Sequence, residues 1–195
     1  MARLEFWYEF ASTYSYPAAM RIEGLAKNAS VEVVWRPFLL GPIFKSQGWT
    51  TSPFNLYPAK GAYMWRDMER ICAGLELPFK RPNSFPQNGL LAARLAVYGL
   101  SKGWGAAFSK AVFRSEFGNG YSIDDANLLA RLVAQSGGDA EDALRGAVTD
   151  ANKSALSEAT RIAAERGIFG SPSFLTESGE LFWGNDRLEQ ALSWA

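Results

Sequence analysis

The strand-like segments of this chain lie near its two ends, and a long helical block separates them. Near the N-terminus, residues 3–8 alternate apolar and polar side chains, and residues 16–25 place apolar side chains at helical spacing. Residues 31–40 are rich in β-branched and aromatic side chains. This order predicts a βαβ unit, in which two parallel strands are joined by a crossover helix. Ser12 or Thr13 is expected to cap that helix.

The rest of the chain is expected to be helical until a final pair of strands. Residues 43–57 combine glycine and proline with several hydroxyl residues and predict a loop. Residues 58–167 follow helical patterns without a β-rich interruption, whereas residues 168–176 and 179–185 predict two strands joined by a short turn. Residues 186–194 predict a last helix. Without the helical block, the expected order is βαβ followed by αββα.

The composition excludes several kinds of catalytic site. The chain has 195 residues, no histidine and one cysteine, Cys72. Without histidine, neither a Ser-His-Asp triad nor a Cys-His pair can form. A single cysteine allows no internal disulfide, no CxxC redox pair and no thiolate zinc site, so no metal is expected. Cys72 is expected to pack as a small apolar residue on the buried face of a helix.

The charge balance also limits the partners. With 20 basic and 20 acidic side chains and no run of like charges, the chain is not expected to bind nucleic acid. No segment approaches the roughly 18 consecutive apolar residues that span a bilayer, and the N-terminus does not resemble a secretory signal. The sequence therefore predicts a cytoplasmic protein that does not bind membranes.

The predicted order of elements is that of an α/β, thioredoxin-like domain that carries a large all-helical insertion. On this interpretation, residues 1–42 and 151–195 form the two parts of the thioredoxin-like domain. Residues 43–150 form the helical insertion domain.

In such a domain the reactive group lies where the first strand turns into the first helix. Here that corner contains Ser12 and Ser15, at the two positions that a CxxC pair would occupy. Unpaired N–H groups at a helix N-terminus favour a nearby anion. Two interpretations of Ser12 remain open: an ordinary helix cap, or a donor to the thiolate of a thiol that the protein binds.

A proline precedes the expected strand at 168–176. In a thioredoxin-like domain the peptide bond before this proline is typically cis and faces the reactive corner. Ser171, before Pro172, would then have backbone N–H and C=O groups free to pair with an extended peptide. The alternative is an ordinary proline at the start of a strand.

Two further motifs carry polar side chains near expected helix starts. Asn185 or Asp186 can cap the last helix, or together they can hold a carboxylate and an ammonium group. Helical spacing places Lys60, Tyr63 and Asp67 on one face. That face is either an ordinary solvated one or a site where lysine meets the carboxylate of a ligand.

Together these motifs resemble the family of kappa-class glutathione transferases and 2-hydroxychromene-2-carboxylate isomerases, a DsbA-like branch of the thioredoxin fold. The family pattern F-x-S-P-Y-S-Y matches residues 10–16, except that Thr13 replaces the proline. The patterns F-G-x-P-[TS]-F and W-G-x-D-R match residues 169–174 and 183–187, and P-x-K-x-x-Y-x-x-x-D begins at Pro58. The resemblance extends over essentially the whole chain.

The resemblance implies that the protein is a homodimer that binds glutathione. Ser12 would activate the thiol, and the Ser171 backbone beside Pro172 would pair with the tripeptide. The catalytic residues implied are Ser12, Lys60 and Tyr63. The remaining implied glutathione contacts are Asn55, Lys60, Asn185 and Asp186. Arg36 and Arg187 are further candidates for a cation that meets the substrate.

The activity implied is a glutathione-dependent isomerisation of an aromatic-pathway 2-oxo acid, of the 2-hydroxychromene-2-carboxylate or trans-o-hydroxybenzylidenepyruvate type. The thiolate would add reversibly to a conjugated double bond. The alternatives are a kappa-class-like glutathione transferase or peroxidase, which consumes glutathione, and a non-catalytic thioredoxin-like binding module. Four aromatic side chains either pack in the core, which is the default interpretation, or form an aromatic wall against a flat substrate: Phe38, Trp49, Trp65 and Phe169.

Overall fold

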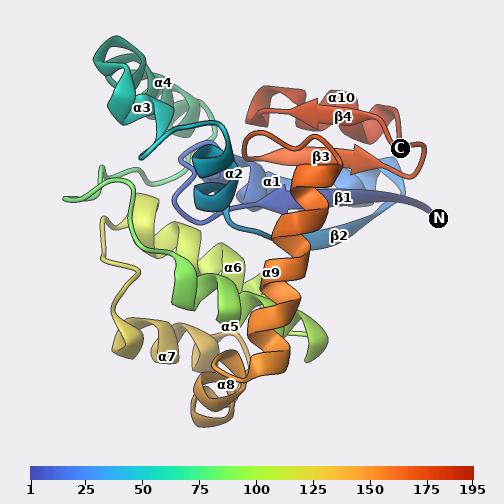
Figure 1. The fold of residues 1–195 in the computed structure, drawn as a ribbon. Coiled ribbons are helices and arrows are strands. Elements are labelled where there is room, and N and C mark those ends of the chain that lie inside the picture. Colours follow the sequence, from blue (N-terminus) through green and yellow to red (C-terminus); the bar gives the residue numbers. More distant parts are fainter.

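A computed structural model describes residues 1–195 and places four strands in one mixed sheet (Figure 1). The strands are β1 (Ala2–Tyr8), β2 (Val31–Pro37), β3 (Ser173–Thr176) and β4 (Leu181–Trp183). Their order in the sheet is β2-β1-β3-β4. β1 runs parallel to β2 and antiparallel to β3, and β3 runs antiparallel to β4. The predicted parallel βαβ unit and the terminal hairpin are therefore confirmed.

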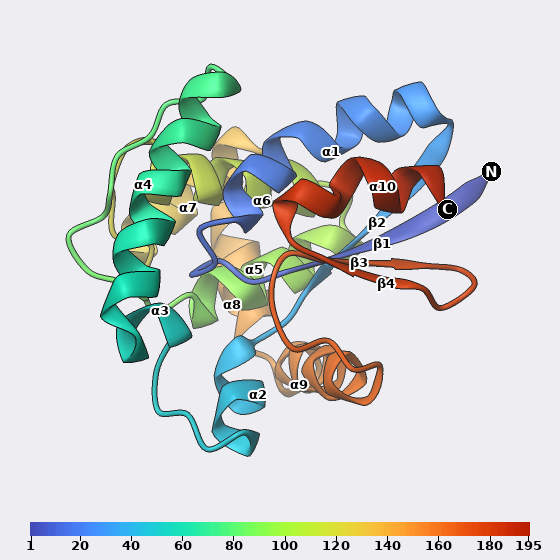
Figure 2. The ribbon, with the colours of Figure 1, turned by 90° about the horizontal axis from the view of Figure 1, so that it is seen from above.

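The helices cover both faces of this sheet. α1 (Ser15–Ala29) and α10 (Leu188–Ser193) lie together on one face, and α9 (Asp150–Glu165) lies on the other beside α2 (Leu40–Ser46) (Figure 2). Both termini lie at the end of the sheet that points away from α4 (Figures 1 and 2). The other helical segments are α3 (Pro53–Leu56), α4 (Pro58–Gly74), α5 (Leu90–Ser101), α6 (Gly105–Phe113), the π-helical turn η1 (Arg114–Gly118), α7 (Ala126–Gln135), α8 (Ala140–Ala147) and the 3-10 turn η2 (Asn185–Arg187). None of these helices combines the length and the apolar character needed to cross a bilayer.

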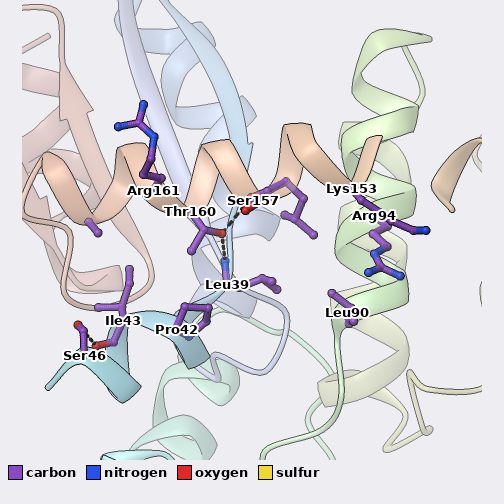
Figure 3. Close-up of a pocket in the computed structure, with 12 residues that line it drawn as sticks. Leu39, Pro42, Ile43, Ser46, Leu90, Arg94, Lys153, Ser157, Thr160 and Arg161 are labelled. Atoms are coloured by element: carbon purple, nitrogen blue, oxygen red, sulfur yellow. Dashed lines mark hydrogen bonds between the residues drawn. The ribbon is translucent and has the colours of Figure 1, made fainter. Parts of the chain in front are cut away.

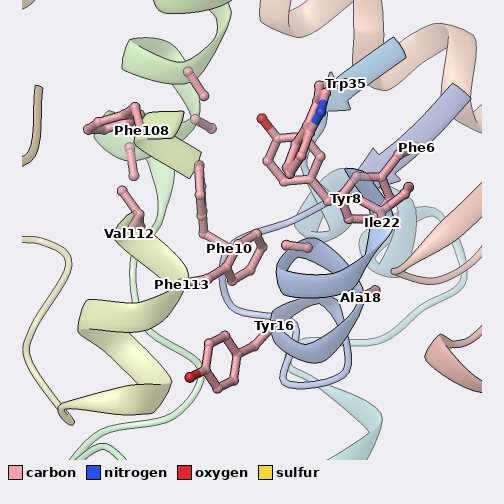
Figure 4. Close-up of a cluster of buried hydrophobic side chains, with 14 of the residues drawn as sticks. Phe6, Tyr8, Phe10, Tyr16, Ala18, Ile22, Trp35, Phe108, Val112 and Phe113 are labelled. Atoms are coloured by element: carbon pink, nitrogen blue, oxygen red, sulfur yellow. The ribbon is translucent and has the colours of Figure 1, made fainter. Parts of the chain in front are cut away.

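Strand β1 is buried on both faces, and its side chains alternate between two cores. Phe6 and Tyr8 belong to the larger core on the α1 side, whereas Trp7 packs with Phe38 on the α9 side. The Phe6 ring lies beside Trp35 and Tyr8 in the larger core (Figure 4), with ring centroids 5.0 Å from Trp35 and 5.2 Å from Tyr8. The alternation predicted for residues 3–8 is confirmed.

The larger core continues from the sheet into the helices between β2 and α9. Phe108 and Phe113 of α6 and Leu129 of α7 are fully buried in the same cluster as Phe6. Cys72 of α4 is also buried there, as predicted, and burial raises the pKa of its thiol to about 11. The division of the chain at 42/43 and 150/151 stays a prediction.

Two predictions for the N-terminal part are wrong. α1 begins at Ser15, and neither Ser12 nor Thr13 caps it, because the cap position is Tyr14 and no side chain bonds there. The loop expected at 43–57 contains most of α2 and all of α3. Ser52 caps α3 by accepting a hydrogen bond from the Phe54 N–H, so a serine and a proline together start a helix here.

Other boundaries also differ from the sequence patterns. β2 ends at Pro37, because proline lacks the N–H that would continue the ladder. The helical run after residue 139 is divided at Thr149, which caps α9 by accepting from the Asn152 N–H at 3.3 Å. β3 begins only at Ser173, so the segment before it is free to line a site.

Replacing Phe6 tests the role of the two-sided burial of β1. Phe6→Ala removes a fully buried ring from the larger core, and we expect the free energy of unfolding to fall by about 3–5 kcal/mol. Denaturant unfolding followed by circular dichroism measures this change. The control Val148→Ala, at an exposed position, should leave the unfolding midpoint unchanged. Equal midpoints for the two variants would contradict the assignment of this core.

Candidate active site

A cavity of about 860 Å³ lies at the C-terminal end of β1, where the corner before α1 meets α2, α3 and α4. Five parts of the chain contribute to its walls although they are far apart in the sequence. Its lining side chains and backbone belong to residues 9 and 11–14, to residues 39–42, 44, 45 and 49–54, to Lys60, to residues 85–90, and to residues 169–171, 183 and 184. The fold thus brings the predicted reactive corner and the predicted proline loop to one cavity.

Ser171 is the residue on which this corner converges. The Ser12 hydroxyl donates to the Ser171 carbonyl oxygen at 2.7 Å, and the Glu9 N–H donates to the Ser171 hydroxyl oxygen at 2.9 Å. The Ser15 and Ser171 hydroxyl oxygens are 2.7 Å apart. The peptide bond between Ser171 and Pro172 is cis, as predicted.

The backbone of Ser171 differs in one respect from the prediction. Its carbonyl oxygen is not free, because the Ser12 hydroxyl already donates to it. Its N–H makes no hydrogen bond within the chain and remains available. The Ser12 hydroxyl can reach a bound ligand only by leaving the Ser171 carbonyl.

Two lysines line the cavity. Lys60, a predicted residue, comes from the first turn of α4, and its Nζ lies 5.1 Å from the centre of the Tyr57 ring. Lys45 comes from the last turn of α2 and was missed because its segment was expected to be a loop. Glu9 is the one acidic residue among those that line the cavity. The cavity therefore suits a ligand with carboxylate groups.

The aromatic wall agrees with the prediction only in part. Trp49 and Phe169 line the cavity, and Trp183, which was not predicted, packs against Phe169 with ring centroids 5.0 Å apart. Phe38 and Trp65 do not line it. Both are core residues: Phe38 lies against Trp7, and Trp65 packs edge-on to Phe85, a cavity residue.

Asn55 and Tyr63 do not line the cavity. The Asn55 amide donates to the Thr51 hydroxyl at 3.3 Å and to the Phe85 carbonyl at 3.1 Å, and so joins two segments of the cavity wall. The Tyr63 side chain is 63% exposed. Asp67, on the same helix, accepts a hydrogen bond from the hydroxyl of Tyr14, a cavity residue, at 3.0 Å.

The residues predicted near the last helix also lie just outside the cavity, next to Gly184. The buried Asn185 accepts from Arg21 at 3.0 Å, whereas Asp186 is exposed and lies 3.7 Å from Arg187. Arg36 pairs with Glu5 at 3.0 Å and also does not line the cavity. Of the cationic candidates named from the sequence, Lys60 lines the cavity, whereas Arg36 and Arg187 do not.

The comparisons with known proteins agree with this geometry. Residues 3–193 match the family model described as a DSBA-like thioredoxin domain. The chain belongs to this family. The resemblance predicted from the sequence is thereby confirmed for the fold.

Curated relatives of this DSBA-like chain carry two enzyme names. A 2-hydroxychromene-2-carboxylate isomerase from Sphingobium xenophagum is 29% identical over 188 residues, which are 95% of this chain and 94% of the relative. Human glutathione S-transferase kappa 1 is 24% identical over 199 residues, with 95% and 87% of the two chains covered. A solved structure of a 2-hydroxychromene-2-carboxylate isomerase has a TM-score of 0.88 at 24% identity and covers 98% of this chain and 93% of its own.

Two carboxyl groups in this DSBA-like domain lie in unusual surroundings. Burial raises the pKa of Glu9 from its ordinary 4.5 to about 8, although a hydrogen bond from the Ala11 N–H opposes the shift. Glu116, in the turn η1, is fully buried and has no hydrogen-bond partner for either carboxyl oxygen. Burial, and next the charge of Glu9, raise its pKa well above the ordinary value. Neither residue belongs to a recognisable sequence motif, so only the folded structure reveals their surroundings.

A second, smaller cavity of about 400 Å³ lies beside α9 (Figure 3). Leu39, Pro42 and Leu90 separate it from the larger one, since they line both. Thr160 holds this wall in place: its hydroxyl accepts from the Leu39 N–H at 3.1 Å and donates to the Leu156 carbonyl at 3.0 Å. No group of three or more acidic or thiol side chains in the chain is arranged to hold a metal ion.

The buried Glu116 makes the stability of the protein depend on pH. Its folded-state pKa lies above the ordinary 4.5, so its contribution is complete below that pH and is lost as the pH rises toward the folded-state pKa. Each pH unit in this interval costs about 1.4 kcal/mol. In Glu116→Gln this pH-dependent loss of unfolding free energy is absent. We therefore expect the unfolding free energy of the variant, relative to wild type, to increase as the pH is raised above about 5.

Denaturant unfolding at several pH values measures that difference. Glu177→Gln, the same change at an exposed position, is the matched control and should follow the wild-type curve. Parallel curves for Glu116→Gln and wild type would show that Glu116 takes up no proton on folding.

Proposed function

We propose that this protein is a glutathione-dependent isomerase of a conjugated aromatic 2-oxo acid, of the 2-hydroxychromene-2-carboxylate or trans-o-hydroxybenzylidenepyruvate type. One observation carries the proposal: the Ser12 hydroxyl and the Ser171 backbone meet at a cavity that also contains two lysines. A serine without histidine cannot be activated as a nucleophile in the usual way, so the sulfur is expected to come from a bound thiol. The names of the curated relatives support the same reaction and the same thiol.

The residues of the cavity fit glutathione. This tripeptide is extended and carries two carboxylates, an ammonium group and a thiol. The unpaired Ser171 N–H can bond to its backbone as an added strand does. Lys60 would meet a carboxylate of glutathione or of the oxo acid, and Lys45 would meet the other. The cavity volume of about 860 Å³ lies within the range of small-molecule sites.

Bound glutathione would supply a thiolate that can add reversibly to a conjugated double bond and leave unchanged. The chain's part begins with Ser12, whose hydroxyl turns from the Ser171 carbonyl to donate to the sulfur and so favours the thiolate over the thiol. Lys45 or Lys60 holds the substrate carboxylate. Trp49, Phe169 and Trp183 contact the flat ring and exclude water from it.

Three further contacts with glutathione are proposed from the positions of residues next to the cavity. Asn55 joins two segments of the cavity wall, and Asn185 and Asp186 follow Gly184, a cavity residue. We propose that these three residues hold the outer parts of the tripeptide. Tyr63 remains a predicted catalytic residue: its side chain does not line the cavity, but it lies on α4 together with the cavity residue Lys60. A homodimer remains a prediction of the resemblance, and a cytoplasmic location remains a prediction from the sequence.

The name of the human relative favours a second function, a glutathione transferase. The two functions differ in the fate of the thiol. An isomerase returns every molecule of glutathione, whereas a transferase consumes one per turnover. Measuring free thiol after complete conversion of the substrate distinguishes them, and we expect full recovery. Thiol loss in proportion to product would replace the isomerase by the transferase.

Ser12→Ala tests the proposed role of the hydroxyl. Because the variant loses a donor to a negatively charged sulfur, we expect kcat at saturating glutathione to fall roughly 100-fold. The ultraviolet absorbance of bound thiolate should fall as well. Ser101→Ala, which removes an exposed hydroxyl bonded to the Tyr98 carbonyl, is the control. Unchanged activity in Ser12→Ala would favour a non-catalytic role for this corner.

Lys60→Met tests the proposed carboxylate contact. A hydrogen bond to a charged group contributes about 1.5–3 kcal/mol, so we expect at least a roughly tenfold weaker binding of glutathione or of the oxo acid. Calorimetry gives the glutathione Kd, and steady-state kinetics gives the KM of the oxo acid. Lys27→Met, at an exposed position in the last turn of α1, should change neither. If both constants keep their wild-type values in Lys60→Met, the contact does not exist.

A further inference from the structure

Glu9 occupies a distinctive place in the cavity. It follows β1 directly, lines the cavity, and is the one acidic residue among the lining residues. Its carboxyl group lies beside Gly89, a cavity residue on another segment: a Cβ at Gly89 would come within 3.7 Å of Glu9 Oε1. Its backbone N–H is held by the Ser171 hydroxyl at 2.9 Å. The backbone that carries this side chain is therefore held by Ser171, the residue that also accepts from Ser12.

The groups that face Glu9 keep its carboxyl neutral near pH 7. No lysine or arginine forms an ion pair with Glu9. Behind it lies the buried Glu116 of η1, an acid and not a base. The Glu9 carboxyl accepts a hydrogen bond from the Ala11 N–H, which favours its charged form. Burial outweighs this bond and raises the pKa of Glu9 to about 8.

The other titratable groups of the cavity are less suited to exchanging a proton with a ligand. The Tyr14 hydroxyl donates to Asp67 at 3.0 Å, and burial, together with that bond, raises its pKa. The two lysines carry positive charges that suit carboxylates. A neutral carboxyl group with a pKa near the working pH is the better proton donor and acceptor.

The isomerisation proposed above needs such a group. When a sulfur–carbon bond forms at the conjugated double bond, an electron pair moves toward the 2-oxo oxygen of the substrate. When that bond breaks, the pair returns and the double bond re-forms. Negative charge that develops on an oxygen in a buried cavity is costly unless a donor or a proton meets it.

We propose that Glu9 is a catalytic acid and base of this reaction: its neutral carboxyl gives a proton to the 2-oxo oxygen of the substrate as charge develops there. It takes the same proton back as the double bond re-forms. Atoms and electrons balance without a further reagent, because the proton returns to Glu9 and the sulfur leaves as it arrived. This inference rests on the proposed isomerase function and adds the residue that manages the proton.

Glu9→Gln tests the inference because glutamine keeps the shape, and its carbonyl can still accept from the Ala11 N–H. We expect kcat at pH 7 to fall about 100-fold, the usual contribution of a positioned acid or base. The glutathione Kd, measured by calorimetry, should stay at the wild-type value, which separates proton transfer from thiol binding. The matched control is Glu5→Gln, the same change on β1 at a residue that pairs with Arg36 and Arg166 and does not line the cavity. Wild-type kcat in Glu9→Gln would overturn the proposal.

A second measurement uses the wild-type protein and does not depend on the folding of a variant. In protein labelled with ¹³C at the glutamate carboxyl groups and free of glutathione, one signal should titrate near pH 8, and kcat should fall over the same range as Glu9 loses its proton. If no glutamate signal titrates there, the proposal fails. If the wild-type protein shows no isomerase activity with glutathione, the proposed function fails instead, whatever the titration shows.

Discussion

The burial of β1 on both faces is the constraint on which the site depends. Phe6 and Tyr8 are enclosed by the core under α1, and Trp7 is enclosed by the core under α9. A slip of β1 by one residue would turn the polar side chains of Arg3 and Glu5 toward the larger core, so its register is fixed. Its end, and the corner that follows it, are therefore held in one place relative to the proline loop at Ser171.

That fixed corner allows a site to be built without histidine. Hydroxyl and backbone groups converge here: the hydroxyls of Ser12 and Ser15 bond to Ser171, and the backbone N–H of Glu9 donates to the Ser171 hydroxyl. Each bond is about as strong as an ordinary hydrogen bond, but together they orient the donors before a ligand arrives. The same corner places the Glu9 carboxyl near the fully buried Glu116, and loss of hydration raises the pKa of both carboxyl groups.

Much of the fold and part of the site could be predicted from local sequence. The alternation in residues 3–8 and the turn before β4 gave the strands that the structure contains, and Cys72 is buried as expected. The motifs at Ser12 and Ser171 gave the corner, because both follow from the position of a serine or a proline at the end of an element. Lys60 was found in the same way, from the spacing after a proline that starts a helix.

The sequence by itself determined the order of the strands and of the long helices, and the chemical types available, since residue periodicity and the absence of histidine are properties of the chain alone. The tertiary structure decided which side chains share a cavity. Lys45 lines the cavity because a short helix forms where a loop was expected. Phe38 lies outside the cavity because it follows the end of β2 at Pro37 and its ring packs on Trp7. The proton affinity of Glu9 was decided in the same way, because it depends on the apolar neighbours that folding places around the carboxyl group.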